Sequence, residues 1–372
     1  MRILFAGGGT AGHINPALAI AGTVKDKIKS AEILYVGAKG GMEETLVPQA
    51  GYDFKSIKIS GFKRSLSPSA IAYNVVTVKR AITSSMEAKK IIKNFQPDIC
   101  VGTGGYVSGP VLRTAAKMGI PTIIHEQNAF PGVTNKMLAK NARFVMLANP
   151  DAKERMGGNY NFVITGNPVR KEIITLDKVE ARAKMNLDNR PVILSFGGSL
   201  GARMINESVA DYIARSGKDG KYQIIHAYGG YGKWFPDLLK EKGCNIDECD
   251  NLDIREFIND MPVCMAAADL VICRAGAMTI SELQAQGKPS ILIPSPNVAE
   301  NHQFHNAMSL VNANAASVIE EKDLTPEKLT ETVDAMVNDP EKLHKYAENA
   351  RKTAIIDAND RILSVIKKCV KL

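Results

Sequence analysis

The chain of 372 residues is long enough for two domains, and 45% hydrophobic with 23% charged residues is an ordinary composition for a globular protein. The net charge of +8 indicates an anionic partner, such as phosphate groups, anionic lipid or nucleic acid, although a basic surface without a dedicated partner would also explain it. No apolar run approaches the roughly 20 residues that span a bilayer, and Met1 and Arg2 lead directly into a strand, so we expect no transmembrane helix, no signal peptide and at most a peripheral membrane contact.

The cysteines exclude two kinds of architecture. Several lie inside apolar runs and none forms a C-x-x-C pair, which argues against a metal site and against a disulfide framework. The pattern predicts reduced core residues of a cytosolic protein. The six are Cys100, Cys244, Cys249, Cys264, Cys273 and Cys369.

The chain opens with a strand, a glycine loop and a helix. Residues 2–6 are apolar, residues 7–13 are rich in glycine, and Pro16 suits the first turn of the helix that follows. The loop has the G-x-G-x-x-G spacing of a dinucleotide fingerprint. However, the next strand, residues 32–36, ends in glycine where a nicotinamide-binding fold needs an acid for the ribose. His13 after the loop is also unexpected for that cofactor, so a dehydrogenase is disfavoured.

A second glycine loop and a polar strand end follow. The strand at residues 97–101 leads into the glycine-rich residues 102–106 and then into a helix over residues 110–117. The next strand, residues 121–124, ends in four polar residues, 125–128. The carboxyl ends of parallel strands are where doubly wound folds bind their ligands. The pattern therefore predicts a ligand site at this edge of the first sheet.

The region between the two glycine loops is basic and apolar. Residues 57–66 form a loop, and residues 70–94 carry a long helical pattern. Such a surface suits anionic lipid headgroups, while a solvated helix face would have the same composition. The basic residues of the helix are Lys79, Arg80, Lys89, Lys90 and Lys93.

The second half repeats the same unit of strand, glycine turn and helix. Residues 190–196 form the strand and residues 197–202 form the turn, in which backbone N–H groups and the Ser199 hydroxyl are suited to a diphosphate. Two similar α/β halves are therefore predicted. Alternating strands and helices continue to about residue 320, and the remaining helical segments are residues 326–337, 340–349 and 360–371.

The main site candidate of the second half is a corner between a strand and a helix. The apolar strand at residues 268–273 and the small residues 275–277 precede a helix over residues 278–286, which Gly287 closes. The start of this helix favours a phosphate, and Glu282, about one turn in, can accept hydrogen bonds from two neighbouring sugar hydroxyls. The alternative is a corner of the fold that binds nothing.

Several of these segments, in their order along the chain, resemble motifs of the MurG family, and the resemblance covers essentially the whole chain. The resemblance implies an α/β protein of the GT-B fold, with two Rossmann-like doubly wound parallel-sheet domains that face each other across a cleft. The domains would be residues 1–165 and 166–351, and the C-terminal helix, about residues 352–372, would pack back on the first. The matching segments are residues 8–17, 125–128, 166–170, 197–202 and 274–279.

The resemblance also implies an activity. The chain would be an inverting glycosyltransferase that moves N-acetylglucosamine from UDP-N-acetylglucosamine to the 4-hydroxyl of the muramoyl sugar of undecaprenyl-diphospho-muramoyl-pentapeptide (lipid I). The products would be lipid II and UDP, in peptidoglycan synthesis. The protein would be peripheral at the cytoplasmic face of the inner membrane, in contact with anionic lipids and cell-wall assembly proteins, and without a nucleic-acid partner.

An inverting displacement needs one base for the acceptor hydroxyl and positive potential for the departing diphosphate. His13 is the candidate base because it titrates near neutral pH; its alternative roles are to bind a substrate phosphate or to shape the loop. Tyr106 and the glycines before it are candidates for holding the acceptor diphosphate. The acceptor-binding residues implied are Thr10, Gly12, Gly104, Tyr106, His125, Glu126 and Asn128.

The donor is expected to bind mainly in the second half. Glu282 would take the ribose hydroxyls, and Ile258 and Met278, which are equally suited to the core, would flank the uracil. His302 and Gln303 would contact the sugar hydroxyls. The residues implied for UDP-N-acetylglucosamine are Thr10, Ala11, Gly12, His13, Asn128, Arg170, Ser199, Ile258, Ala277, Met278, Glu282, His302 and Gln303.

No cofactor and no obligatory metal is expected. The sequence has no Asp-x-Asp motif where a diphosphate-bound metal would need one, and the acidic residues 247–250 lie in a polar loop away from the glycine turns. Arg170, Ser199 and the helix N-terminus near residue 277 would instead neutralise the diphosphate.

Three other functions stay open. A related GT-B enzyme with another lipid acceptor, such as a diacylglycerol glycosyltransferase, would share the donor site. A sugar-nucleotide epimerase would act on the donor without any lipid. A non-catalytic scaffold for cell-wall assembly is disfavoured because His13, Asn128 and Glu282 are all present.

Overall fold

The computed structural model describes residues 1–61, 67–217 and 219–370, without the side chains of residues 68–79, 81, 82 and 217. Lys63 and Arg64 of the basic loop and the side chain of Lys79 therefore lie outside the described residues. The chain divides into two compact units, Met1–Pro168 with Asp357–Leu372, and Val169–Ile356. Each unit is described by itself below.

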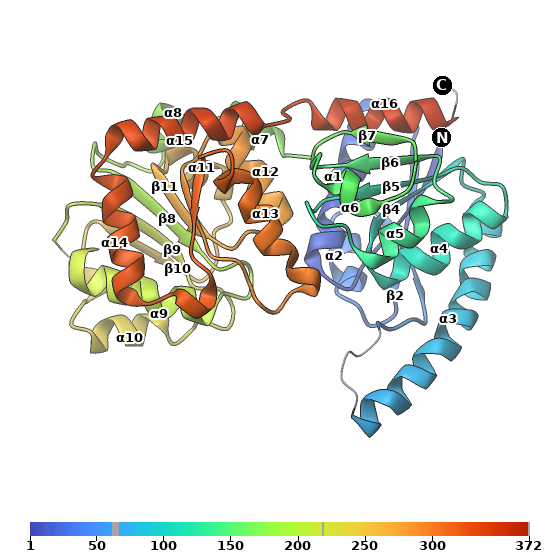
Figure 1. The fold of residues 1–372 in the computed structure, drawn as a ribbon, viewed down its shortest axis with the longest axis horizontal. Coiled ribbons are helices and arrows are strands. Elements are labelled where there is room, and N and C mark those ends of the chain that lie inside the picture. Colours follow the sequence, from blue (N-terminus) through green and yellow to red (C-terminus); the bar gives the residue numbers. More distant parts are fainter. Residues whose placement is uncertain (62–66, 218, 371–372) are drawn as a thin grey trace. The chain divides into compact units, whose positions relative to one another are not determined.

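The first unit is built on a parallel sheet of seven strands in the order β3-β2-β1-β4-β5-β6-β7 (Figure 1). Successive residues of β1 alternate between the two faces: Phe5 packs with Ile20 in one core, and Leu4 packs with Val111 in the other. Both faces are buried, which explains the nearly continuous apolar strands. The strands are β1 (Arg2–Gly7), β2 (Glu32–Ala38), β3 (Asp53–Ile57), β4 (Ile99–Gly104), β5 (Thr122–Glu126), β6 (Phe144–Leu147) and β7 (Phe162–Ile164).

Helices cover both faces of this sheet. One of them, α16, comes from the far end of the sequence, and its Ile362 and Ile366 are buried in the core that also holds Phe5 and Ile20. The helices of the first unit are α1 (Ala11–Lys27), α2 (Glu43–Gln49), α3 (Pro68–Phe95), α4 (Gly105–Lys117), α5 (Val133–Ala139), α6 (Ala152–Met156) and α16 (Ala358–Val370).

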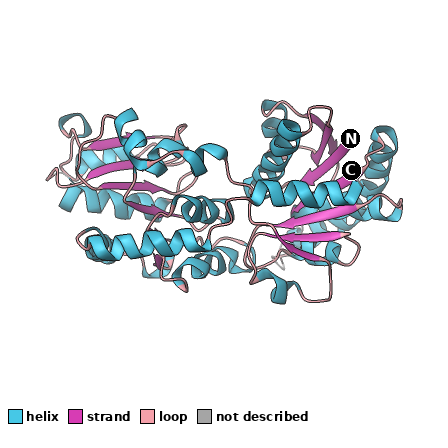
Figure 2. Cartoon of the chain, turned by 90° about the horizontal axis from the view of Figure 1, so that it is seen from above, coloured by secondary structure: helices cyan, strands magenta, loops and turns pink. Residues whose placement is uncertain are grey.

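The second unit has a parallel sheet of six strands in the order β10-β9-β8-β11-β12-β13. Figure 2 shows helices in cyan around the magenta strands of each unit. Two doubly wound α/β units are thus confirmed. The strands are β8 (Val192–Phe196), β9 (Gln223–Ala227), β10 (Leu252–Arg255), β11 (Leu270–Cys273), β12 (Ser290–Leu292) and β13 (Ala316–Val318).

The helices of the second unit also lie on both sides of its sheet, over two separate hydrophobic cores. In the described part of this unit, a π-helical segment, Ile213–Gly217, continues α9, and short 3₁₀ turns occur at Ile246–Glu248, Ala299–Asn301 and Glu321–Asp323. The α-helices are α7 (Lys171–Thr175), α8 (Lys178–Lys184), α9 (Arg203–Tyr212), α10 (Phe235–Glu241), α11 (Met261–Ala267), α12 (Ala277–Gln286), α13 (His302–Val311), α14 (Pro326–Val337) and α15 (Pro340–Thr353).

Two helix starts differ from the sequence-based prediction. Helices α1 and α4 begin directly after their glycine loops, at Ala11 and Gly105, and not near Pro16 and Pro110. Each proline is the sixth residue of its helix. Proline at that position removes the hydrogen bond to the carbonyl four residues earlier and crowds that carbonyl. Both helices nevertheless include their proline and start before it. As a result, His13 lies in the first turn of α1 and not in a loop before it.

Candidate functional site

The two glycine loops of the first unit pack directly against each other. A Cβ atom on Gly105 would overlap the carbonyl oxygen of Gly8, and one on Gly9 would lie 2.6 Å from a ring carbon of Tyr106. Both Gly9 and Gly105 also have positive φ angles, of 86° and 76°. These glycines are therefore required by close packing and backbone conformation, apart from any role in binding a phosphate.

His13 lies where these loops meet. Its Nδ1 is 3.1 Å from the Thr10 hydroxyl, and its backbone carbonyl accepts a hydrogen bond of 2.7 Å from the Thr103 hydroxyl at the end of β4. The ring lies against Gly104, where a Cβ atom would come within 2.8 Å of its Cδ2 and 3.1 Å of its Nε2. The side chain is half-buried. The sequence-predicted Thr10, His13 and Gly104 are thus brought together.

A buried carboxylate, Glu43, packs against the first glycine loop and hydrogen-bonds to it. Its side chain is fully buried, and it accepts hydrogen bonds from the backbone N–H groups of Ala38, at 2.8 Å, and Gly9, at 3.5 Å. A Cβ atom on Gly8 would overlap its Oε1, and one on Gly41 would lie 2.7 Å from its carboxyl carbon. Sequence reasoning missed Glu43. The glycines at 37, 40 and 41 beside it were the available signal, since closely spaced glycines next to a charged residue indicate close backbone approach.

Glu126, at the end of β5, organises the loop that follows it. Its Oε1 accepts from the backbone and side-chain N–H groups of Asn128, at 3.0 and 3.1 Å, and its Oε2 accepts from Gly132 N and Asn135 Nδ2, at 3.0 and 2.8 Å. Four donors surround a carboxylate that is 1% exposed. This arrangement positions Asn128, which is half-buried, and leaves Glu126 itself in the interior.

His125 is also an interior residue. Its Nε2 lies 2.9 Å from the carbonyl oxygen of Gly166, and its Nδ1 lies 3.1 Å from Nε2 of Gln127. Burial lowers the pKa of this imidazole, and the contact with Gly166 and the charge of Glu126 only partly oppose the effect. A neutral His125 therefore links the strand end to the turn at Gly166. Gln127, buried like its neighbour, was not predicted as a site residue.

The second unit contains a cavity of about 520 Å³ at the carboxyl end of its sheet. The glycine turn after β8 forms one wall, and the start of α12 with the segment before α13 forms another. Helix α12 begins at Ala277 after an extended Gly276, and Gly287 closes it in the left-handed conformation, as predicted. The lining residues are Phe196, Gly197, Gly198, Gly201, Ala202, Arg203, Met204, Arg274, Gly276, Thr279, Ser295, Asn297, Gln303 and Glu321.

Of the residues predicted from the sequence to bind UDP-N-acetylglucosamine, Gln303 is the one that lines this cavity. Its Oε1 accepts a hydrogen bond of 2.9 Å from the backbone N–H of Ser295. His302 is not among the lining residues, and its Nδ1 lies 2.8 Å from the carbonyl oxygen of Ala299. Glu300 and Asn301 before it both have positive φ angles, 53° and 48°. Two consecutive residues in this conformation are strained, and such strain clusters at ligand sites.

Arg170 and Glu282, predicted to bind different parts of the donor, contact each other. The Arg170 guanidinium donates to the Glu282 carboxylate at 3.2 Å, and the side chains are 48% and 15% exposed. Burial raises the pKa of Glu282, and the charge of Arg170 only partly counteracts it. Neither residue lines the cavity of Gln303.

The other predicted donor residues take different positions. Ser199 is exposed on the glycine turn, and Ala277 and Met278 are half-buried in the first turn of α12. Ile258 is 4% exposed and belongs to a hydrophobic core of the unit, together with Met265. The structure thus gathers the glycine turn and the start of α12 around one cavity, while the Ile258 side chain is a core residue.

Three charged residues of the cavity wall, Arg203, Arg274 and Glu321, were not predicted as site residues. Arg274 donates to the carbonyl oxygens of Ile293, at 3.1 Å, and Pro294, at 3.2 Å, and forms an ion pair with Glu321. One guanidinium thereby ties together the ends of β11, β12 and β13. A signal was available, because Arg274 stands directly after an apolar strand, where doubly wound folds place ligand sites.

Within the described ranges, no group of three or more His, Cys, Asp or Glu side chains is arranged to hold a metal ion. Among the helices of the same ranges, none is long and apolar enough to cross a membrane.

Two family descriptions match the chain. "Glycosyltransferase family 28 N-terminal domain" matches residues 3–147, and "Glycosyltransferase family 28 C-terminal domain" matches residues 192–362. A protein of Acetivibrio thermocellus, named UDP-N-acetylglucosamine--N-acetylmuramyl-(pentapeptide) pyrophosphoryl-undecaprenol N-acetylglucosamine transferase, is 45% identical over 372 residues. That similarity covers 100% of this chain and 99% of the other protein.

Solved structures give the same picture of the fold. The crystal structure of MurG from Acinetobacter baumannii superposes with a TM-score of 0.78 at 27% identity, over 99% of both chains. A UDP-GlcNAc 2-epimerase from Neisseria meningitidis superposes with a TM-score of 0.65 at 16% identity, over 99% of this chain and 100% of that one. The second similarity shows a shared fold alone.

Proposed function

The chain belongs to the MurG family of glycosyltransferases and has the GT-B fold, and from this premise we propose that it transfers N-acetylglucosamine from UDP-N-acetylglucosamine to lipid I. The new bond forms to the 4-hydroxyl of the muramoyl sugar with inversion, and the products are lipid II and UDP. The reaction is the step of peptidoglycan synthesis that completes the lipid-linked disaccharide.

The observation that carries the donor assignment is the cavity of the second unit. It lies at the carboxyl end of a parallel sheet, between a glycine turn and the N-terminus of α12. Free N–H groups and the helix dipole make such a place favourable for a diphosphate. Ser199 and Arg170 add a hydroxyl and a cation, so we propose that they bind the UDP phosphates.

The nucleoside and the sugar take the two sides of this diphosphate in our proposal. Glu282 binds the ribose hydroxyls. Its ion pair with Arg170 either opens when the ribose binds, or the carboxylate contacts Arg170 and the ribose together. Met278 and the backbone near Ile258 hold the uracil. Gln303, which lines the cavity, contacts the sugar: its carbonyl oxygen accepts from Ser295, so its N–H groups are the proposed donors to the sugar. His302 shapes this loop through its contact with Ala299.

His13 acts as the base in the proposed mechanism. With the Nδ1 proton donated to the Thr10 hydroxyl, Nε2 is the basic nitrogen of the neutral imidazole. Nε2 takes the proton of the 4-hydroxyl as that oxygen bonds to the anomeric carbon of the donor. The bond from this carbon to the diphosphate oxygen breaks, and its electron pair leaves with UDP.

We propose that Asn128 and Tyr106 contact the acceptor and that His125 and Glu126 act behind them. Asn128, in the loop after β5, and Tyr106, in the first turn of α4, are both half-buried. The interior Glu126 holds Asn128 by two hydrogen bonds, so it sets the orientation of the amide. Thr10, Ala11 and Gly12, in and just before the first turn of α1, complete the surface next to His13.

A bound metal is not required in this proposal. The start of α12 and Arg170 supply the positive potential that the departing diphosphate needs. Turnover that persists in excess chelating agent would support this view, and loss of turnover that Mg²⁺ restores would contradict it.

We propose a peripheral position at the cytoplasmic face of the membrane, where the protein would reach the bilayer-anchored acceptor lipid I. We propose that α3 contributes to this contact. Arg80, Lys89, Lys90 and Lys93 are exposed along it, next to an exposed Met86. Basic and apolar side chains together favour anionic lipid surfaces.

The test is release of UDP from UDP-N-acetylglucosamine, with and without a short-chain analogue of lipid I. Release that requires the analogue and yields a disaccharide product supports the proposal. Release without any acceptor would indicate an epimerase or hydrolase, and tight UDP binding without turnover would indicate another lipid acceptor.

A substitution tests the base. His13→Ala should lower kcat by roughly 10²-fold or more and leave the UDP affinity unchanged. Equal losses of kcat and UDP affinity would contradict the assignment of His13 as the base.

A further inference from the structure

The first turn of α1, which carries His13, has weak internal support. Thr10 stands at the N-cap, yet its side chain makes no capping hydrogen bond, because its hydroxyl contacts the His13 ring. Pro16, the sixth residue of the helix, has no N–H to donate to the Gly12 carbonyl. Helix ends that lack such bonds fray readily. Inside the helix, the N–H groups of His13 and Ile14 donate to the Thr10 carbonyl at 3.0 and 3.2 Å, and a contact from outside the helix adds to this support.

The last residues of β4 supply that support. Thr103 is completely buried, and its hydroxyl donates to the His13 carbonyl over 2.7 Å. Space for this contact exists because residue 7 is glycine: a Cβ atom on Gly7 would overlap the Thr103 oxygen. Gly104, with a φ angle of 103°, then brings the backbone under the imidazole ring. Both the backbone and the ring of His13 are thus fixed by neighbouring residues of one strand.

We propose that Thr103 is a positioning residue of the transfer reaction, which holds the His13 base through the carbonyl of the first helical turn. This inference rests on the proposed role of His13. Thr103 does not touch the substrates. It acts by preventing the first turn of α1 from shifting, and a displacement of about 1 Å of a catalytic group can lower a rate by roughly a hundredfold.

Three substitutions separate the hydroxyl from the shape of the side chain. Thr103→Val keeps the shape and removes the hydroxyl, whereas Thr103→Ser keeps the hydroxyl and removes a methyl group. Thr122→Val is the matched control. Thr122 is the first residue of β5, at the amino-terminal end of the strand next to β4, whereas Thr103 lies near the carboxyl end of β4. The Thr122 side chain is buried, and its hydroxyl donates to the Asn141 carbonyl at 3.3 Å. The Thr122→Val control thus removes a hydrogen bond of the same kind, from a hydroxyl to a backbone carbonyl, at a place that has no contact with His13.

The expected kinetic result is a loss of kcat in Thr103→Val of roughly tenfold to a hundredfold. The affinity for UDP should stay within about twofold of the wild-type value, because the proposed UDP-binding residues belong to the other unit. Thr103→Ser and Thr122→Val should both keep kcat within roughly threefold. A wild-type kcat in Thr103→Val would overturn the proposal, and so would equal losses in the valine and serine variants.

A second readout does not depend on turnover. The chain has six histidines, so the imidazole signals of His13 can be assigned in NMR spectra by comparison with His13→Ala. We expect Thr103→Val to change the titration midpoint and the mobility of the His13 ring, and Thr122→Val to change neither. Unchanged His13 signals in Thr103→Val would refute the positioning role. If the wild-type protein transfers no sugar but the His13 signals respond as expected, the proposed function fails while the support of His13 by Thr103 stands.

Discussion

At the scale of single residues, several glycines are explained by one neighbouring side chain. Gly8, Gly37 and Gly41 each lie where a Cβ atom would come within 3 Å of Glu43 or overlap it. A carboxylate with no exposed surface is costly to bury unless hydrogen bonds satisfy it, and two backbone N–H groups do so here. The glycine-rich sequence around the first loop therefore reflects internal packing as much as ligand binding.

This packing predicts a non-additive pair of substitutions. Gly8→Ala alone should destabilise the first unit by roughly 1–3 kcal/mol, because its methyl group overlaps the carboxylate. In a Glu43→Ala background the same change should cost much less, since the overlapping atoms are gone. Urea unfolding of the four proteins in the cycle measures both values. Equal costs of Gly8→Ala in the two backgrounds would contradict the contact.

The pair of Arg170 and Glu282 gives a prediction about the donor. Glu282→Ala should weaken UDP binding by roughly tenfold or more, because hydrogen bonds to a charged group contribute about 1.5–3 kcal/mol. Gln284→Ala, on the same helix, is the control and should bind UDP normally. Calorimetric titration measures both affinities. Unchanged affinity in Glu282→Ala would contradict the ribose role.

The raised pKa of Glu282 adds an expectation about pH. Because burial raises this pKa, the UDP affinity of the wild type should begin to fall on acidification at a higher pH than it would with an ordinary glutamate.

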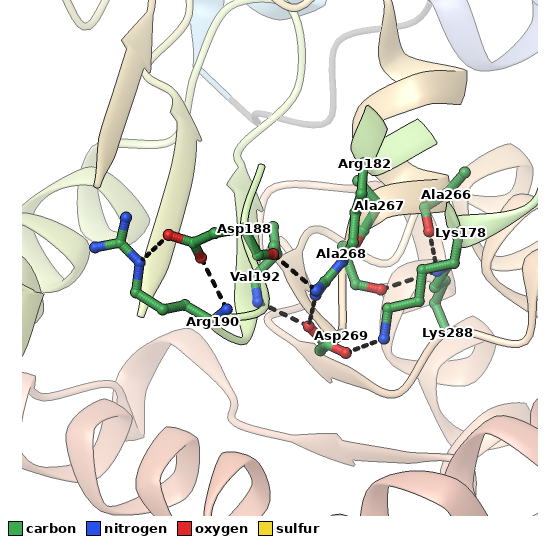
Figure 3. A network of polar contacts seen from close by, with 10 residues as sticks. All are labelled: Lys178, Arg182, Asp188, Arg190, Val192, Ala266, Ala267, Ala268, Asp269 and Lys288. Atoms are coloured by element: carbon green, nitrogen blue, oxygen red, sulfur yellow. Dashed lines mark hydrogen bonds and ion pairs between the residues drawn. The ribbon is translucent and has the colours of Figure 1, made fainter. Parts of the chain in front are cut away.

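At the scale of elements, a polar network joins α8 and the C-terminal end of α11 to the starts of β8 and β11 (Figure 3). Asp269 accepts from Val192 N at 2.7 Å and pairs with Arg182 and Lys178. Lys288, which is 6% exposed, donates to the carbonyl oxygens of Ala266 and Ala268 at 2.7 and 2.8 Å. These bonds satisfy carbonyl groups at the end of α11.

Lys288 should make stability depend on pH. Burial lowers the pKa of this lysine to about 7, whereas an unfolded lysine titrates near 10.4. Between these values the unfolded chain binds one more proton than the folded chain, so the free energy of unfolding rises with pH, and the cost of the buried charge is fully present only below pH 7.

The difference in unfolding free energy between the wild type and Lys288→Met should thus shift in favour of the wild type by about 1–2 kcal/mol between pH 7 and pH 9. Lys345→Met, at an exposed lysine, is the control and should unfold in parallel with the wild type. Chemical unfolding at several pH values provides the measurement. Parallel curves for Lys288→Met would contradict the lowered pKa.

Helix α3 carries the prediction about membranes. Vesicles with anionic lipid should retain the protein at low salt and release it at high salt, since salt screens exposed charges. Replacing Lys89, Lys90 and Lys93 with alanine should weaken binding by roughly a hundredfold, because each lysine near the surface contributes about 1 kcal/mol. The same change at Lys322, Lys328 and Lys345 of the second unit is the control. Absence of retention at any salt concentration would refute a basic lipid-facing helix.

At the scale of the whole molecule, the two units have separate cores, and the chain returns to the first unit at its end. Ile366 of α16 is fully buried in the same core as Phe5 of β1. Every residue proposed to bind UDP itself lies in Val169–Ile356. A ligand that binds one folded unit stabilises that unit. The two units should therefore respond to different perturbations.

Differential scanning calorimetry tests this division. Ile366→Ala should destabilise the first unit by about 2–5 kcal/mol, as large-to-small core substitutions do, and lower only its thermal transition. Saturating UDP should raise only the transition of the second unit. Ile224→Ala, in a core of the second unit, is the matched control and should act on the other transition. A single transition that both changes move equally would contradict independent responses.

The sequence by itself determined the class of fold, because apolar runs, glycine turns and helical periodicity are local properties that alternate regularly along the chain. It also determined the corner at the start of α12: the closing Gly287 and the position of Glu282 one turn in both follow from spacing along one helix. Motif order identified the family. The helix starts at Ala11 and Gly105 were predicted too late, since proline in the second turn looks like a start when only local preference is considered.

Only the tertiary structure decided what the remaining polar residues do. His125 and Glu126 have the same residue types as an exposed site, yet both are interior, because the turn at Gly166 and the loop after β5 fold over them. The support of His13 by Thr103, and of the first glycine loop by Glu43, joins residues 90 and 34 positions apart in the sequence. Contacts at such separations depend on which strands become neighbours, and no local pattern in the chain contains that information.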